Sequence, residues 1–243
     1  MPEQLLLTRL LNAHLAGAVD ALLRAVHVTP QYAQAPITNA FAMELLASGL
    51  LLAFFLAVRL TLNVEKPGGV QQLAEMANEF VSGQAESIVG HGYEEFVGYL
   101  TTIGMFILIC NLMGLVPGLE SPTGSPVVPL GLAVVTFVYY HYYGIRANGF
   151  GYVKQFLGPV WWLAPLMVII ELVSHFARIL SLTIRLYANM YAGDLLTLVF
   201  FSLVPVGLPL VFMGLHLMVA VIQAYVFMLL ATIYVSLAVS HDH

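Results

Sequence analysis

Six polar side chains recur between residues 171 and 189 at spacings that bring them to one face of a helix. They are Glu171, Ser174, Arg178, Ser181, Arg185 and Asn189. At about 100° per residue they fall within an arc of roughly 80°, on a stretch otherwise rich in Leu, Ile, Phe and Tyr. An ionisable side chain in hydrocarbon costs roughly 2.5–3.5 kcal/mol or more. This polar stripe therefore predicts a polar neighbour, a water-filled path, or both.

Arg185 is the decisive residue of the polar stripe. Its guanidinium stays protonated even when desolvated, so it is a fixed positive charge that requires an acidic partner. Asp194 is nine residues away in the sequence and faces another direction on the helix. Glu171 is fourteen residues away, or about 21 Å along the axis. The missing partner indicates that the carboxylate comes from another subunit.

The last apolar run adds two polar groups, His216 and Gln223, seven residues apart and so on nearly the same face of a helix. A turn between residues 204 and 208 would make this helix antiparallel to the one that carries the polar stripe. His216 could then meet Asp194, and Gln223 would lie closer to Arg185. A pair of Asp and His side chains in an apolar setting is suited to relaying protons.

The amino-acid composition of the chain indicates whether these polar side chains lie in a soluble domain or in a membrane. The chain has 243 residues, of which 60% are hydrophobic and 9% are charged, whereas a soluble domain carries about 25% charged residues. This predicts an integral membrane protein. The net charge of −5 and the lack of a basic cluster argue against nucleic acid as a partner. Cys110 is the single cysteine, and neither a metal site nor a cofactor is expected.

The hydrophobic pattern predicts an all-α integral membrane protein with one membrane domain, residues 1–243. The expected elements are an amphipathic N-terminal helix over 3–27, a span over 41–62, an interfacial amphipathic helix over 70–89, two further spans over 98–116 and 127–143, and two long helices over 161–204 and 208–240. We expect the three spans to be roughly vertical and the two long helices to form a tilted hairpin. The tilt follows because a helix of 44 residues would reach about 66 Å, against a hydrocarbon core of about 30 Å.

Basic residues predict the orientation of the spans. Arg59 and Lys66 follow the first span, and Arg146 and Lys154 follow the third, whereas the loops at 117–126 and 205–207 hold no Lys or Arg. Because basic residues accumulate on the cytoplasmic side, we expect the N-terminus outside and the C-terminus in the cytoplasm.

Two segments carry a family resemblance. The run SLTIRLYANMYAGDLL at 181–196 and the run HLMVAVIQAYVFMLL at 216–230 resemble subunit a of the F-type ATP synthases, the proton-channel subunit beside the rotor ring. The first span, the amphipathic helix and the NLMGLVPGLESPT segment appear in the order of that family. The resemblance implies a non-catalytic membrane subunit of the Fo sector. Its implied partners are the ring of subunit c, the peripheral stalk subunit b and the rest of the complex, in a bacterial plasma membrane.

The resemblance also implies roles for individual residues. Arg185 matches the stator arginine that faces the carboxylate of each passing rotor subunit. The positions that match the half-channel open to the outside and its neighbourhood are Asp194, His216, Asn189 and Gln223. The positions that match the half-channel to the cytoplasm are Glu171, Ser174, Arg178 and Ser181. Many relatives have Glu where this chain has Asp194, so the acidic character is kept but the side chain is shorter.

The resemblance implies a rotary mechanism. A proton enters from outside past Asp194 and His216, neutralises a rotor carboxylate, and leaves toward Glu171 after nearly a full turn. Arg185 keeps the two paths apart. The ion is expected to be a proton and not sodium.

Other functions make different demands on the residues. A membrane cytochrome would need paired histidines on facing spans, and His141, His175 and His216 show no such pairing in the sequence. A self-contained ion-coupled transporter should transport alone, and a structural anchor would leave the polar stripe unexplained. Some residues also have plainer structural interpretations: Arg178 could pair with Glu171 or Ser174 on its own face, and His175 could simply be packed.

Overall fold

A computed structural model describes residues 5–25, 36–63, 66–116, 118–149, 164–203 and 207–239. Their elements, in chain order, are α1 (Leu6–Ala25), α2 (Asn39–Leu60), α3 (Gly69–Val89), α4 (Glu94–Met113), the 3-10 turn η1 (Pro122–Gly124), α5 (Val127–Asn148), α7 (Ala164–Leu203) and α8 (Leu208–Val239). Among these, α2, α4, α5, α7 and α8 are long and apolar enough to cross a membrane. The expectation of an all-α integral membrane protein is confirmed. Residues 3–4, 26–27, 161–163, 204 and 240 of the expected elements, and Lys154, lie outside the described residues.

The two long helices are the largest elements. α7 has 40 residues and α8 has 32, which correspond to lengths of about 60 and 48 Å. Both exceed the hydrocarbon thickness of about 30 Å, so neither could stand upright within it. Pro209 lies in the first turn of α8, where a proline has no helical hydrogen bond to lose.

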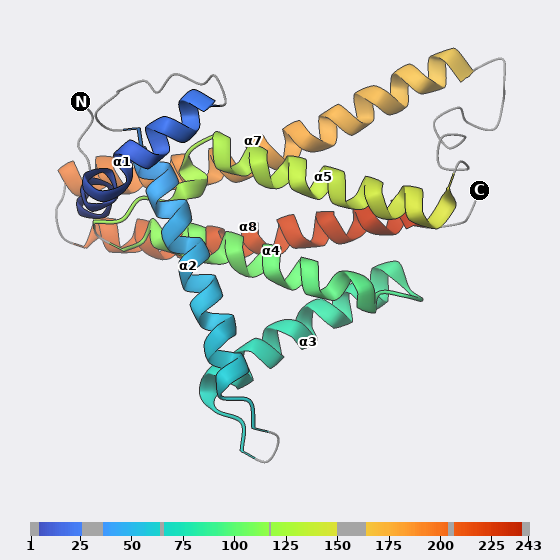
Figure 1. The fold of residues 1–243 in the computed structure, drawn as a ribbon, viewed down its shortest axis with the longest axis horizontal. Coiled ribbons are helices and arrows are strands. Elements are labelled where there is room, and N and C mark those ends of the chain that lie inside the picture. Colours follow the sequence, from blue (N-terminus) through green and yellow to red (C-terminus); the bar gives the residue numbers. More distant parts are fainter. Residues whose placement is uncertain are drawn as a thin grey trace.

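The directions of the other helices differ from the expected arrangement. Figure 1 shows that α4 and α5 run roughly along α8, whereas α2 crosses them steeply and α3 lies beside α4 and α8. The three expected spans do not share one direction, because α4 and α5 follow the long hairpin and α2 crosses them. The physical reason is that an apolar stretch specifies a length sufficient to span but no tilt, which is set by packing against neighbouring helices.

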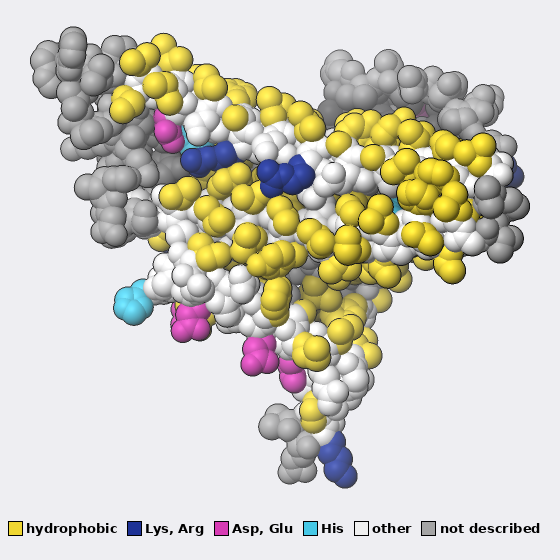
Figure 2. Space-filling model, turned by 180° about the vertical axis from the view of Figure 1, so that it is seen from behind, with side chains coloured by type: hydrophobic (Ala, Val, Ile, Leu, Met, Phe, Trp, Pro, Cys, Tyr) yellow, Lys and Arg dark blue, Asp and Glu magenta, His cyan; other side chains and the backbone are white. Residues whose placement is uncertain are grey.

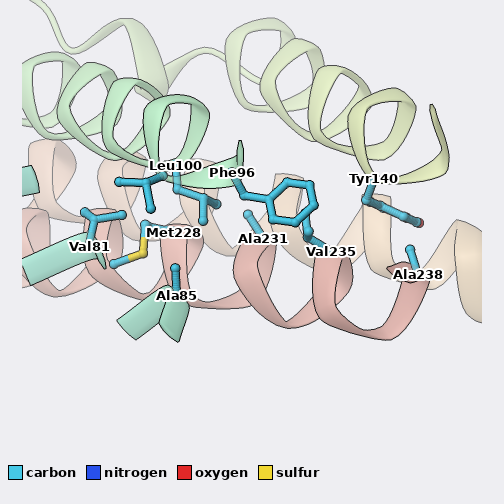
Figure 3. Close-up of a cluster of buried hydrophobic side chains, with 10 residues drawn as sticks. Val81, Ala85, Phe96, Leu100, Tyr140, Met228, Ala231, Val235 and Ala238 are labelled. Carbon is cyan, nitrogen blue, oxygen red and sulfur yellow. The ribbon is translucent and has the colours of Figure 1, made fainter. Parts of the chain in front are cut away.

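Close packing against α8 aligns these helices. In one buried cluster, side chains of α3, α4 and α5 meet a face of α8 (Figure 3); its members include Val81, Ala85, Phe96, Leu100, Tyr140, Met228, Ala231, Val235 and Ala238. Alanines on the facing helices let the backbones approach closely, as in other membrane helix pairs. At Gly104 an added Cβ would already lie 3.6 Å from Met228, so α4 and α8 are in close contact there.

A second cluster fixes the rotation of α7. Leu182, Leu186 and Met190 recur every fourth residue, are at most 3% exposed, and pack with α8 residues that include Ala220 and Phe227. We call these three α7 residues the core face. At about 100° per residue, the core face lies between the polar stripe on one side and Asp194 on the other. The polar stripe therefore borders the contact with α8 without being enclosed by it.

Two helices extend a few residues beyond the apolar segments from which they were predicted. α4 begins at Glu94 and not at 98, with Glu94 and Glu95 in its first turn, where carboxylates interact favourably with the positive end of the helix dipole. α5 continues past 143 to Asn148 and ends at Gly149, whose φ of +53° suits glycine. Backbone hydrogen bonding extends both helices beyond their apolar segments.

Candidate functional site

The polar stripe lies along an accessible face of α7. Glu171, Ser174, Arg178 and Arg185 are half-buried, and Ser181 and Asn189 are exposed. The side chains around them include exposed Val173, Leu180 and Ile184. Figure 2 shows basic side chains in a row on a largely hydrophobic surface. Fixed charges on such a surface require either water or a polar partner beside them.

Arg185 makes one side-chain hydrogen bond within the described part of the chain. Its Nη2 donates a hydrogen bond of 3.4 Å to Oγ of Ser181, one turn earlier on the same helix. The ion pairs found among the described residues involve Arg146, His175 and His216, and none involves Arg185. A hydroxyl cannot neutralise a guanidinium, so the charge of Arg185 is available to a group outside the described residues.

Asn189 connects the polar stripe to α8. Its Nδ2 donates a hydrogen bond of 2.8 Å to Oε1 of Gln223, which is 4% exposed. Asn189 is one turn beyond Arg185 on α7, so Gln223 lies near the arginine, as the antiparallel arrangement predicts. The pair joins the two long helices at the depth of the fixed charge.

The structure brings Asp194 and His216 together on the other side of the core face. Nδ1 of His216 lies 3.7 Å from Oδ1 of Asp194, and His216 is 3% exposed while the Asp194 side chain is 38% exposed. Nε2 of His216 is buried and has no hydrogen-bond partner among the described residues. An acid near the surface is therefore linked to an imidazole inside, and the two differ in their access to water.

Glycines make room for this pair. A Cβ added at Gly193 would lie 3.0 Å from Cγ and Cδ2 of the His216 ring, and a Cβ at Gly114 would lie 3.2 Å from Oδ1 of Asp194. A Cβ at Gly124 would lie 3.3 Å from Oδ2 of Asp194. Glycines on three different elements thus surround the carboxylate and the ring, and a side chain at any of them would have to displace one or the other.

Replacing Gly193 with alanine is expected to reduce several-fold any proton transport that passes through Asp194 and His216, measured as proton pumping by membrane vesicles. The added methyl group pushes the His216 ring away from Asp194, and contacts of 3.0 Å to a ring leave little freedom to adjust. Gly214→Ala is the matched control, because a Cβ there meets nothing within 4 Å. Equal pumping by the two variants would contradict the expectation.

A buried polar network behind Asp194 was not predicted from the sequence. Oγ of Ser121 donates to the Cys110 carbonyl oxygen at 3.1 Å and lies 2.7 Å from Oγ1 of Thr123. Thr123 donates to Oδ1 of Asn111 at 2.7 Å, and Nδ2 of Asn111 donates to the Ala220 carbonyl oxygen at 3.1 Å. The network joins α4, η1 and α8. The signal was Asn111 inside an apolar stretch together with the hydroxyls of SPT, but nothing in the sequence pairs them.

At the other end of the polar stripe, the structure changes the expected partners. The guanidinium of Arg178 lies 5.2 Å from the Tyr234 ring centroid, and no ion pair joins it to Glu171 within the described residues. The alternative that Arg178 pairs with Glu171 is therefore not seen among the described residues, where its guanidinium lies over Tyr234. The partner of Glu171 is His175, with Nε2 3.4 Å from Oε1. His175, for which a packed or solvated side chain was the plainer interpretation of the sequence, is 6% exposed and belongs to this polar group.

Two histidines also lie close together, contrary to the sequence expectation. The ring centroids of His141 and His175 are 4.8 Å apart because α5 and α7 meet there. Tyr140 lies beside Nδ1 of His175, and Glu171 lies beside its Nε2. Nδ1 of His141 is 2.9 Å from the carbonyl oxygen of Phe137 on the same helix. The rings are tilted by 58°. This geometry does not resemble a pair of axial haem ligands.

Comparison with known proteins identifies similar chains. The family model described as the ATP synthase A chain matches residues 41–236. A Koribacter versatilis protein named ATP synthase subunit a is 55% identical over 244 residues, covering 100% of each chain. A protein of that name from Solibacter usitatus is 47% identical over 233 residues, covering 96% of this chain and 99% of its own. The counterpart in Geotalea uraniireducens is 42% identical over 177 residues, covering 73% and 77%. The family match includes the whole polar stripe, Asp194, His216 and Gln223.

Proposed function

The chain belongs to the ATP synthase A chain family, and we propose that it is the proton-translocating stator subunit of a rotary F-type ATP synthase. The family expected from residues 181–196 and 216–230 is thereby confirmed. The chain is a multi-pass membrane protein and a non-catalytic subunit of the Fo sector. Its contribution to the complex is to load and unload protons on the rotor ring, which drives rotation.

Arg185 is the stator charge in this proposal. The observation that carries it is a half-buried guanidinium on a largely hydrophobic face, hydrogen-bonded to Ser181 and in no ion pair with a described carboxylate. A carboxylate on a passing rotor subunit would supply the missing negative charge. Once protonated, that carboxyl group is neutral and can turn into lipid at low cost, whereas the ionised form is held near Arg185.

Two offset half-channels reach the rotor site. Protons enter from outside past Asp194 and His216, with Asn189 and Gln223 beside the arginine, and bind the rotor carboxylate. Protons leave toward the cytoplasm along Glu171, Ser174, Arg178 and Ser181. The support is geometric, because Asp194 with His216 and the polar stripe lie on opposite sides of the core face. Each elementary charge that crosses 100 mV releases about 2.3 kcal/mol, which rotation carries to the catalytic head.

The proposed setting rests on the same reasoning. The subunit lies in a bacterial plasma membrane beside the ring of subunit c, with peripheral stalk subunit b as a further partner. Arg59, Lys66 and Arg146 lie on the cytoplasmic side together with the C-terminus, and the N-terminus lies outside.

Identifying what co-purifies with the chain tests this function. Mild solubilisation of membranes through an affinity tag on this subunit should recover a ring of small hairpin proteins and a soluble ATPase. Reconstitution of the purified subunit alone should give little proton transport, because the moving carboxylates are on the rotor. Robust transport by the isolated subunit would instead support a self-contained transporter.

A further inference from the structure

A series of polar contacts, one hydrogen bond and one ion pair, connects α5 to the Glu171 end of the polar stripe. The hydroxyl of Tyr140, a residue that is 2% exposed, lies 3.1 Å from Nδ1 of His175. Nε2 of His175 lies 3.4 Å from Oε1 of Glu171. His175 is itself 6% exposed, whereas the Glu171 side chain is 37% exposed. This series of contacts therefore runs from the protein interior to a carboxylate that water can reach.

The direction of the hydrogen bonds follows from the partners. A neutral imidazole has one nitrogen that donates and one that accepts, and the partner of one nitrogen fixes the tautomer at the other. When the Tyr140 hydroxyl donates to Nδ1, the ring proton is on Nε2, the nitrogen that lies 3.4 Å from Oε1 of Glu171. The opposite tautomer would set a nitrogen lone pair against carboxylate lone pairs. The order from Tyr140 through His175 to Glu171 is the one that satisfies an ionised carboxylate.

The neighbouring basic side chains have other partners, and His175 contacts the Glu171 carboxylate. The nearest basic side chain on the same helix, Arg178, is stacked over Tyr234 of α8 and is not paired with Glu171. Nδ1 of His141 lies 2.9 Å from the Phe137 carbonyl oxygen. His175 contacts the carboxylate, and it is held from α5 as well as from its own helix.

We propose that Tyr140 and His175 are positioning residues for Glu171. They hold the carboxylate toward the polar stripe as the acceptor of the departing proton. The proton released by the rotor carboxylate bonds to Glu171 and then passes to water, while His175 and Tyr140 keep their own protons. This inference rests on the proposed function, because it deepens the role given to Glu171 at the end of the cytoplasmic half-channel.

Two amides that imitate different halves of the imidazole test the role of His175. The side-chain nitrogen of glutamine can take the position of Nε2 and donate to Glu171, whereas asparagine reaches only the position of Nδ1, beside Tyr140. In membrane vesicles that hold the complete complex, His175→Gln should keep ATP-driven proton pumping within about twofold of wild type. His175→Asn should lower it about tenfold, because loss of a hydrogen bond to a charged group typically costs a factor of that order. If asparagine rescues pumping and glutamine does not, the histidine serves packing with Tyr140 and the proposal fails.

Tyr140→Phe completes the design. Without the hydroxyl the histidine tautomer is no longer fixed, so pumping should fall several-fold in the wild-type background. In the His175→Gln background the same change should have little effect, because an amide has no tautomers. Equal losses in both backgrounds would overturn the assigned order of hydrogen bonds. The amount of this subunit in the purified complex is measured for each variant, so that pumping is compared per assembled complex.

Glu171→Gln distinguishes a failure of this inference from a failure of the proposed function. If Glu171→Gln impairs pumping but His175→Asn does not, then Glu171 acts in the half-channel without its histidine, and the positioning role is wrong. If Glu171→Gln pumps like wild type, the cytoplasmic half-channel assigned to Glu171 is itself wrong.

Discussion

Replacing Arg185 with alanine is expected to reduce proton-driven ATP synthesis to background while the catalytic head still hydrolyses ATP. Opposite charges 4 Å apart attract by about 4 kcal/mol at the effective dielectric typical of sites near a protein surface, which corresponds to about a thousandfold in an equilibrium constant. Without the guanidinium, the rotor carboxylate loses the charge that holds it between the two half-channels. ATP synthesis and hydrolysis by the same vesicles are the measurements.

Other arginine variants separate this role from a general need for positive charge. Arg146→Ala is the matched control outside the polar stripe, because its exposed guanidinium pairs with Glu95 and lies over the Tyr143 ring. A cation–π contact contributes about 0.5–1 kcal/mol at exposed sites, so this variant should lose less than about fivefold. Arg185→Lys keeps the charge but replaces a rigid fork by a compact ammonium, and most of the synthesis should still be lost. Normal synthesis by Arg185→Ala would refute the stator role.

Replacing Asp194 with asparagine is expected to slow proton uptake from outside by at least about tenfold, because a positioned acid or base typically contributes 10²–10⁴-fold to proton transfer. An amide is nearly the same size as the carboxylate, so it fits beside Gly114 and Gly124 but does not accept and release protons. ATP synthesis driven by an imposed pH difference measures the step directly. Quantification of the purified complex checks that assembly is intact.

Asp194→Glu is the companion variant. It keeps the acid but adds a methylene beside Gly114 and Gly124, which lie so near the carboxylate that a Cβ on either would come within 3.2–3.3 Å of its oxygens. Its synthesis rate should fall between wild type and Asp194→Asn. If asparagine proves as good as aspartate, the carboxylate is not on the proton path.

The contacts between α7 and α8 could be predicted because few geometric steps separate them from the sequence. Two long apolar runs joined by a short turn must lie antiparallel, and a spacing of seven residues brings His216 and Gln223 to one face. The structure has Asp194 beside His216 and Gln223 bonded to Asn189. The polar side chains that make each contact could be identified because such side chains are rare in these apolar runs.

The contacts made by α4 and α5 could not be predicted in this way. Tyr140 is 35 residues from His175, and Asn111 is 109 residues from Ala220. Which side chains meet over such distances depends on the tilt and rotation of each helix, and hydropathy specifies neither. The sequence accordingly left His175 open to interpretation as a packed or solvated side chain. It also left Arg178 open to a partner on its own helix, whereas the structure places the Arg178 guanidinium over an aromatic ring of α8.

The core face of α7 has a consequence for the energy efficiency of the machine. Leu182, Leu186 and Met190 form a continuous hydrocarbon layer between Asp194 and the polar stripe. A proton that passed directly between these three side chains would leave water behind, and such transfers cost several kcal/mol at least. On the proposed mechanism, these three apolar side chains are electrical insulation within the stator. Leakage across the membrane would then be limited by how tightly hydrocarbon packs as well as by the charge of Arg185.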